Sequence, residues 1–178
     1  NSGEWHKFYV DKSGIFRLSR SFLSQLGLNT NSIDPRNIKI FGNGGNMLPL
    51  SNSVEYPVDP IENAIKVHGE DDGVFNNSDY ILFYAQGPNA YNSDSNTNLN
   101  LYSDQTAYFI NISPSPGKRI LENVQPVNTA NTIVDSYTAY KYHELDEYNI
   151  AKIGRRWFGD RFDFDSNQTF EFTFPNLR

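Results

Sequence analysis

The hydrophobic and polar positions of the chain alternate in short runs, which is the pattern of β-strands with one buried face. Residues 5–10 and 169–174 alternate clearly, and residues 80–85 form the most hydrophobic run. Further strands are expected at residues 15–18, 37–41, 63–68, 107–112 and 119–124. Short strands separated by turn residues predict a mainly β fold, namely an antiparallel β-sandwich.

The connections between these strands predict two hairpins and one short helix near the N-terminus. A Lys-Ser-Gly turn joins the first two strands, and a Ser-Pro-Ser-Pro-Gly turn at residues 113–117 joins the strands on either side of it. Ser19 is a suitable N-cap for a helix that ends near Leu26, and Gly27 is a suitable stop. Residues 133–145 fit either a strand or a helix.

Composition and charge exclude several classes of function. The 178 residues suffice for one domain with a hydrophobic core. The net charge is −6 and no basic stripe is visible in the sequence, so nucleic acid is not an expected partner. No hydrophobic run approaches the ~20 residues that a membrane-spanning helix needs. Asn is the commonest residue and aromatic residues make up 15%, which is typical of exported β-proteins.

The sequence shows no constellation of catalytic residues. The chain has no cysteine, which excludes thiol nucleophiles, disulfides and zinc–thiolate sites. Its three histidines lie outside any known nucleophile or zinc motif. The pair His143 and Glu144 fits a metal site or, equally, a polar stretch in solvent. Residues 42–46 lack the Lys and the helix of a phosphate loop, so they are expected to form a hairpin turn.

An acidic loop at residues 69–79 resembles a calcium-binding loop. If Asp72 takes the fifth position of such a loop, Glu70 takes the third and Asp79 the twelfth. His68 then stands at the first position, where a hard cation prefers an oxygen ligand. The alternative is a turn that reverses at Asp72 and is capped by Asp79. Glu70, Asp72 and Asp79 are therefore the candidate metal ligands, and calcium is the one cofactor that the sequence suggests.

Residues 154–162 combine Trp157 with two phenylalanines, three arginines, an aspartate and two glycines. Exposed rings form an apolar patch, whereas buried charges need partners. We expect this segment to pack within its own domain or onto a following one, with an arginine stacked on Trp157 or paired with Asp160. The alternative is a ligand platform on which a sugar ring stacks against Trp157. The residues of this candidate docking surface are Arg155, Arg156, Trp157, Phe158 and Arg161.

Five segments, taken in order along the chain, resemble a known family. Two of them read Trp-His-Lys-Phe-Tyr-Val-Asp-Lys-Ser-Gly-Ile-Phe at residues 5–16 and Asp-Pro-Arg-Asn-Ile-Lys-Ile-Phe-Gly-Asn-Gly-Gly-Asn-Met-Leu at residues 34–48. The others are residues 69–84, 98–108 and 154–162. The series resembles the N-terminal region of the PorU family, the sortases of the type IX secretion system of Bacteroidetes, and it covers nearly the whole chain.

This resemblance implies a role as part of a larger protein. The family is similar to gingipain-type cysteine peptidases, acts at the outer surface of the outer membrane, removes the C-terminal sorting signal from exported cargo and supports its attachment to lipopolysaccharide. Its catalytic Cys and His belong to a later domain, so no catalytic residue transfers to this chain. Residues 1–178 are therefore expected to form a single, non-catalytic N-terminal β domain of an exported protein at the surface of a Gram-negative bacterium. The implied partners are the peptidase domain of the same chain, other secretion-system proteins and cargo.

A carbohydrate- or calcium-binding surface module is the alternative class of function. The acidic loop, the tyrosines of residues 137–142 and the Asn-rich loops favour it.

Overall fold

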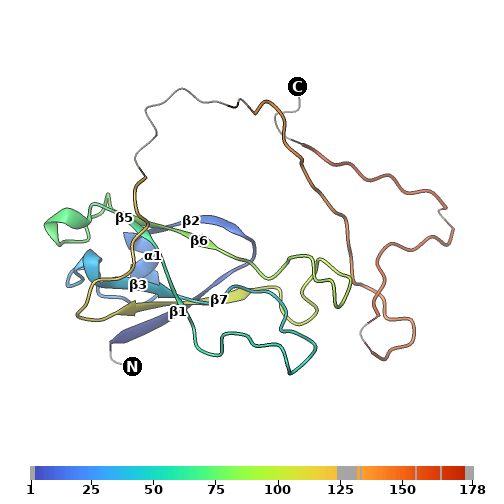
Figure 1. The fold of residues 1–178 in the computed structure, drawn as a ribbon, viewed down its shortest axis with the longest axis horizontal. Coiled ribbons are helices and arrows are strands. Elements are labelled where there is room, and N and C mark those ends of the chain that lie inside the picture. The colour runs from blue at the N-terminus through green and yellow to red at the C-terminus, as the bar shows by residue number, and fades with distance from the viewer. Residues whose placement is uncertain (1–2, 124–131, 133, 155, 165, 175–178) are drawn as a thin grey trace. The chain divides into compact units, whose positions relative to one another are not determined.

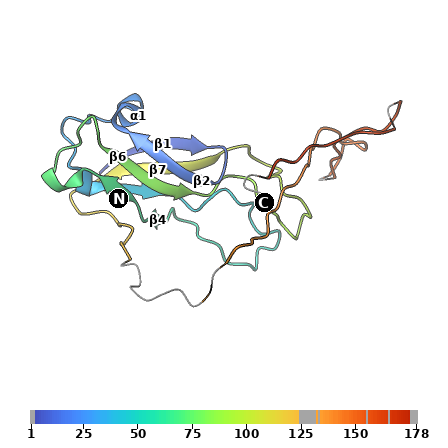
Figure 2. The same cartoon turned by 90° about the horizontal axis from the view of Figure 1, so that it is seen from above.

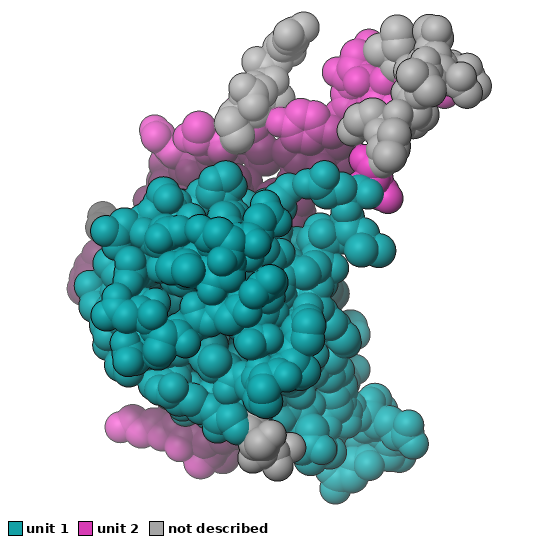
Figure 3. All heavy atoms as spheres, turned by 90° about the vertical axis from the view of Figure 1, so that its left-hand side faces the viewer, with its two compact units in different colours: residues 1–122 teal, residues 123–178 magenta. Residues whose placement is uncertain are grey.

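The computed structural model describes residues 3–123, 132, 134–154, 156–164 and 166–174. The chain divides into two compact units, residues 1–122 and residues 123–178, which are coloured separately in Figure 3. All helices and strands of the described residues belong to the first unit. None of the helices in the described part of the chain is long and apolar enough to cross a membrane.

The first unit is a sandwich of two antiparallel sheets (Figure 1 and Figure 2). The four-stranded sheet has the order β1-β7-β3-β4, and its strands are Glu4–Val10, Thr106–Ile112, Ile38–Phe41 and Glu62–Asn63. The three-stranded sheet has the order β2-β6-β5, and its strands are Gly14–Ser19, Tyr80–Ala85 and Lys66–His68. This architecture confirms the predicted mainly β, antiparallel sandwich.

Among the described residues the single α-helix, α1, spans Arg20–Gln25 and begins directly after β2. The Phe22 N–H donates a hydrogen bond to the Ser19 hydroxyl at 3.2 Å, so Ser19 is the N-cap that the sequence predicted. Gly27 follows the helix with φ of +96°, a left-handed conformation that favours glycine. Leu23 is fully buried and fixes the helix to the core. Two 3₁₀ helices, η1 at Pro35–Asn37 and η2 at Glu70–Asp72, lie in loops.

The hydrophobic core lies between the two sheets, because every second side chain of each strand points inward. The rings of Phe8 and Phe83 meet edge to face at 5.8 Å, and the ring of Tyr108 lies within 6.0 Å of both. The Tyr108 hydroxyl accepts a hydrogen bond from the Gln86 N–H at 2.8 Å and donates one to the Gln86 carbonyl oxygen at 3.2 Å. The intervening residues of β1, β3 and β7 are left to face outward.

The hairpin predicted from the first two strands is wrong. Residues 5–10 and 15–18 lie in strands as expected, but β1 pairs with β7 and β2 pairs with β6. The two strands therefore belong to different sheets. This arrangement lets Phe8 and Leu18 face the same core from opposite sheets, which buries both side chains.

The run at residues 63–68 is not one strand but parts of two. Strand β4 belongs to the four-stranded sheet and β5 to the three-stranded sheet, and the chain crosses between them at the fully buried Ile65. Residues 42–46 do not form a tight hairpin turn either, because they begin the long connection from β3 to β4. Sequence alternation alone does not show where a chain changes sheets.

Three further segments that were predicted as strands, or as strand or helix, are irregular. Residues 119–123 contribute an isolated bridge between Arg119 and Ile65. Residues 134–145 and 169–174 form neither helix nor strand. An alternating pattern becomes a strand when a neighbouring strand supplies hydrogen-bond partners. Outside the described residues lie positions 124 and 133 of these segments and Arg155 of the candidate docking surface.

Candidate functional site

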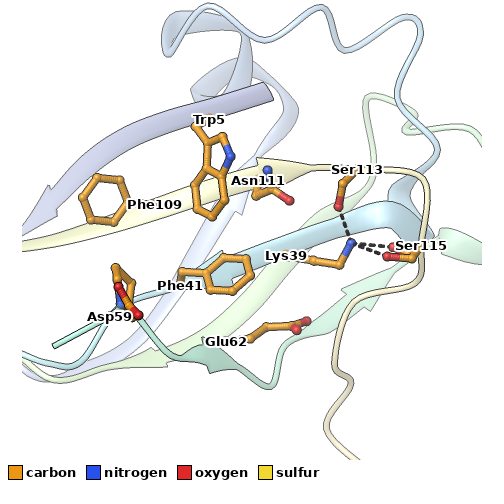
Figure 4. A pocket seen from close by; sticks show the side chains of 10 residues that line it. Trp5, Lys39, Phe41, Asp59, Glu62, Phe109, Asn111, Ser113 and Ser115 are labelled. Carbon is orange, nitrogen blue, oxygen red and sulfur yellow. Dashed lines mark hydrogen bonds between the residues drawn. The ribbon is translucent and has the colours of Figure 1, made fainter. Parts of the chain in front are cut away.

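The outer face of the four-stranded sheet carries two neighbouring rows of side chains. In the first row, Trp5 of β1 and Lys39 of β3 flank Asn111 of β7, because the strand register pairs both of them with Asn111. In the second row, Phe109 of β7 lies beside Phe41 of β3. All five positions alternate with core residues of the same strands, so their side chains point away from the core. Together they line an open groove (Figure 4).

Three aromatic rings supply the apolar surface of this groove. The ring centroids of Trp5 and Phe41 lie 5.1 Å apart, and the two ring planes meet at 46°. Phe41 and Phe109 are half-buried, whereas Trp5 keeps 39% of its surface exposed. The two rings are therefore tilted against each other rather than stacked in parallel. A cluster of exposed apolar side chains with polar neighbours is typical of a binding surface.

Lys39 forms a wall of the groove and is only 7% exposed. Its ammonium group donates hydrogen bonds to the Ser113 hydroxyl at 2.5 Å, the Ser115 carbonyl oxygen at 2.6 Å and the Ser115 hydroxyl at 3.0 Å. These three bonds use all three donors of the ammonium. Neighbouring Asn111 is 3% exposed and donates to the Glu4 carbonyl oxygen at 3.2 Å. The wall is thus held in place before any ligand binds.

Two carboxylates, Asp59 and Glu62, line the groove near Phe41 (Figure 4). The Oε1 atom of Glu62 accepts a hydrogen bond from the Lys118 N–H at 2.6 Å. Within the described residues, the Oε2 atom of Glu62 and the carboxylate of Asp59 accept none. The groove has a volume of about 810 Å³, which lies in the range of small-molecule sites, roughly 300–1,000 Å³.

The groove is suited to binding rather than to covalent chemistry. Among the described residues that line it there is no histidine or cysteine, and its two serines are engaged by Lys39. A serine becomes a nucleophile only beside a general base, and an ammonium that donates all its protons does not act as one. What the groove offers a ligand is apolar ring surface beside free carboxylate oxygens.

Sequence reasoning missed this groove although its strands were predicted. Trp5, Phe41 and Phe109 all lie in segments that the alternation predicted as strands. Their meeting depends on the strand order, in which β7 lies between β1 and β3. A prediction of hairpins between consecutive strands keeps these three residues apart.

The three candidate calcium ligands are engaged by groups of the protein itself. The carboxylate of Glu70 pairs with the guanidinium of Arg119 at 2.8 Å. Asp72 accepts a hydrogen bond from the Asn76 side chain at 3.0 Å, and buried Asp79 accepts one from the Asn76 N–H at 2.6 Å. Among the described residues, no group of three or more His, Cys, Asp or Glu side chains is arranged to hold a metal ion. The calcium hypothesis stays a prediction.

In the second unit, residues 154–162 partly pair with the chain upstream of them. Phe158 and Tyr148 exchange two backbone hydrogen bonds of 2.8 Å. The guanidinium of Arg161 lies over the Tyr148 ring, 5.4 Å from its centroid, and pairs with Asp163 at 3.1 Å. The carboxylate of Asp160 lies 2.9 Å from the ring nitrogen Nε2 of His143, so this histidine has a carboxylate partner. The segment is therefore anchored in its own unit by backbone pairing and ion pairs.

Comparisons with known proteins find a partial likeness. No protein-family model matches the chain, and no curated protein matches it. Among solved structures, the chain is similar to the dimeric latent PorU from Porphyromonas gingivalis, with 26% sequence identity and a TM-score of 0.46. The match covers 75% of this chain and 12% of that chain, so the chain spans a small part of the length of that protein.

Proposed function

We propose that the chain is a non-catalytic domain of a cell-surface sortase of the type IX secretion system, and that it docks onto the peptidase part of the same protein. The five ordered segments that resemble the PorU family support the choice of family. The absence of cysteine from the sequence supports a non-catalytic role, because the family uses a cysteine nucleophile. Secretion-system proteins and cargo at the outer membrane are the further partners in this proposal.

The observation that carries the docking proposal is the exposed apolar surface of the second unit. Phe164 is 99% exposed, and Trp157, Phe158, Phe170 and Phe172 each keep about two fifths or more of their surface in contact with solvent. So many exposed rings within a short segment are unfavourable in water and typical of a surface that another protein region covers. In this proposal the peptidase domain, which follows this region in the family, covers these exposed rings.

Residues 169–174 support a docking contact that is made by strand pairing. Phe170 and Phe172 alternate with Glu171 and Thr173, as in a half-buried strand, yet the segment forms no strand. A strand needs a neighbour that supplies backbone hydrogen bonds, and a lone segment stays irregular. A strand of the peptidase part is therefore proposed to pair with residues 169–174 and to cover their phenylalanine face.

The second part of the proposed docking surface is the pair Trp157 and Phe158. Backbone pairing with Tyr148 fixes Phe158, and Arg161 lies over the same tyrosine ring. Tryptophan and arginine are the residues that most often carry the binding energy of protein interfaces, and anchoring them beforehand reduces the entropy lost on binding. Arg155 and Arg156 are included in the proposed surface because of their position in the sequence motif, beside Trp157.

The docking proposal is tested by introducing Trp157→Ala both into the full-length sortase and into the isolated 178-residue chain. We expect Trp157→Ala to lower the free energy of unfolding of the full-length sortase by about 2 kcal/mol, because a central interface aromatic is lost. In the isolated 178-residue chain the same change is expected to shift stability by less than about 0.5 kcal/mol, since the side chain is partly exposed there. Tyr84→Ala, an exposed aromatic of β6, is the matched control.

Equal effects of Trp157→Ala in the full-length protein and in the isolated chain would contradict the docking role.

The non-catalytic role has its own test, in which the purified chain is incubated with a peptide that carries a C-terminal sorting signal. We expect no cleavage by the isolated chain, and cleavage that survives repeated purification would refute this part of the proposal.

A further inference from the structure

We propose that the groove on the outer face of the four-stranded sheet binds a neutral saccharide. This assignment concerns the first unit, and it is independent of the docking role proposed for the second. It rests on the aromatic surface of the groove, on the charges around it and on the hydrogen-bonding groups that remain free.

The aromatic surface fits the apolar face of a sugar ring. The C–H groups on one side of a pyranose pack well on the face of an aromatic side chain, and Trp5 has much of its surface open to solvent. Phe41 meets Trp5 at 46°, so a ring that rests on Trp5 is also contacted from the side. Phe109 of the neighbouring strand extends this surface along β7 (Figure 4).

The charges around the groove select against anionic ligands. Among the described residues that line it, the two carboxylates of Asp59 and Glu62 outnumber the one ammonium, that of Lys39. This ammonium is paired with serine oxygens and with no carboxylate of the described residues, so it offsets only part of the negative charge. An uncharged ligand with an apolar face avoids the repulsion and still uses the aromatic surface.

The free polar atoms of the groove match the hydroxyl groups of such a ligand. Within the described residues, the Asp59 carboxylate and the Oε2 atom of Glu62 accept no hydrogen bond and are open to donor hydroxyls. The indole N–H of Trp5 likewise has no acceptor among the described residues and is open to an acceptor hydroxyl. A saccharide hydroxyl both donates and accepts, so a single sugar chain satisfies both kinds of group. The fixed wall of Lys39 and Asn111 keeps the site formed in advance.

The test is a titration of the 178-residue chain with linear glucose and mannose oligomers of two to four units. The chain contains two tryptophans, so the Trp157→Phe variant leaves Trp5 as the one tryptophan that reports binding by fluorescence. We expect a saturable change in Trp5 fluorescence with a dissociation constant of about 1 mM or below, and matching heats by calorimetry. Trp5→Ala is expected to weaken binding at least about tenfold, whereas Tyr84→Ala on the opposite sheet leaves it unchanged within about twofold.

Asp59→Ala provides a second variant that does not depend on the fold, because this side chain is exposed in a loop. It is expected to weaken binding at least about threefold while the melting temperature stays the same. Absence of binding to every oligomer at millimolar concentration would overturn the assignment, as would binding that survives both Trp5→Ala and Asp59→Ala. The full-length protein is expected to bind equally well. Loss of binding there would show that another domain covers the groove, and would also overturn the assignment.

Discussion

The rings of Trp5 and Phe41 lie 5.1 Å apart although a whole strand, β7, separates the strands that carry them. The contact is diagonal, since Trp5 shares its row with Asn111 and Phe41 shares its row with Phe109. Long aromatic side chains on one face of a sheet reach such diagonal neighbours. Asn111 lies between Trp5 and Lys39 in its row and is 3% exposed, which is unusual for a polar residue on an outer face. Side chains on the outer face of the four-stranded sheet therefore pack against one another, separately from the hydrophobic core.

The contact between Trp5 and Phe41 predicts a measurable contribution to stability. We expect Trp5→Ala to lower the free energy of unfolding by about 1–2 kcal/mol, from the lost ring pair and the lost apolar burial. Urea unfolding followed by circular dichroism measures this change. Tyr84→Ala is the control, with an expected change within about 0.5 kcal/mol. Equal effects of the two substitutions would show that the Trp5–Phe41 contact adds nothing to stability.

The buried ammonium of Lys39 predicts that its replacement by an apolar side chain destabilises the protein. Lys39→Met keeps most of the length of the side chain but leaves the Ser113 and Ser115 oxygens without their donor, so we expect a loss of about 1–3 kcal/mol in the free energy of unfolding. Lys66→Met is the matched control, because Lys66 forms an exposed ion pair with Glu122 that is worth about 0–1 kcal/mol. A Lys39→Met protein as stable as the unchanged one would contradict the structural role of this lysine.

The hydroxyl of Tyr108 predicts a third effect on stability. Burial raises the pKa of this phenol above its ordinary value, so the group stays protonated and holds both the N–H and the carbonyl oxygen of Gln86. We expect Tyr108→Phe to reduce the free energy of unfolding by about 1–3 kcal/mol, because two partly buried backbone groups lose their partner. Thermal melting measures the change. A variant that melts at the temperature of the unchanged protein would show that water replaces the hydroxyl without penalty.

The contacts of the acidic loop predict that calcium does not stabilise the protein. Glu70 is held by Arg119, and Asp72 and Asp79 are bound by groups of Asn76, so a calcium ion has to displace contacts that already exist. We expect millimolar calcium to leave the melting temperature unchanged. A site filled at 100 times its dissociation constant stabilises a protein by about 2.7 kcal/mol, which a melt detects readily. A clear upward shift that Asp72→Asn removes would establish the calcium site and contradict this expectation.

The local structure of the first unit was predictable where short-range chemistry decides it. Ser19 and Gly27 bound the helix as predicted, since capping depends on neighbouring residues alone. The strand at residues 80–85 was predicted with its observed bounds, because its hydrophobic run is long enough to stand out. Strand pairing was not predictable in this way. The turn between β1 and β2 has the residues of a hairpin, but burial of Phe8 and Leu18 between opposite sheets outweighs that signal.

The candidate groove could not be predicted from the sequence, because it depends on the order of the strands in the sheet. Trp5, Phe41 and Phe109 each lie in a segment that was predicted as a strand, yet only the order of the strands brings them together. The acidic loop shows the opposite case: neighbouring residues suggested one site, whereas in the structure Asp72 and Asp79 both accept hydrogen bonds from Asn76 and Glu70 pairs with a distant residue. Glu70 is taken by Arg119, which follows it by 49 positions and was expected in a strand of its own.

Hydrogen–deuterium exchange at residues 169–174 tests the central proposal most directly. The backbone N–H groups of this segment are compared in the isolated 178-residue chain and in the full-length sortase. The docking proposal predicts rapid exchange in the isolated chain and slow exchange in the full-length protein, because a strand of the peptidase part then accepts their hydrogen bonds. Equally rapid exchange in both proteins would contradict it.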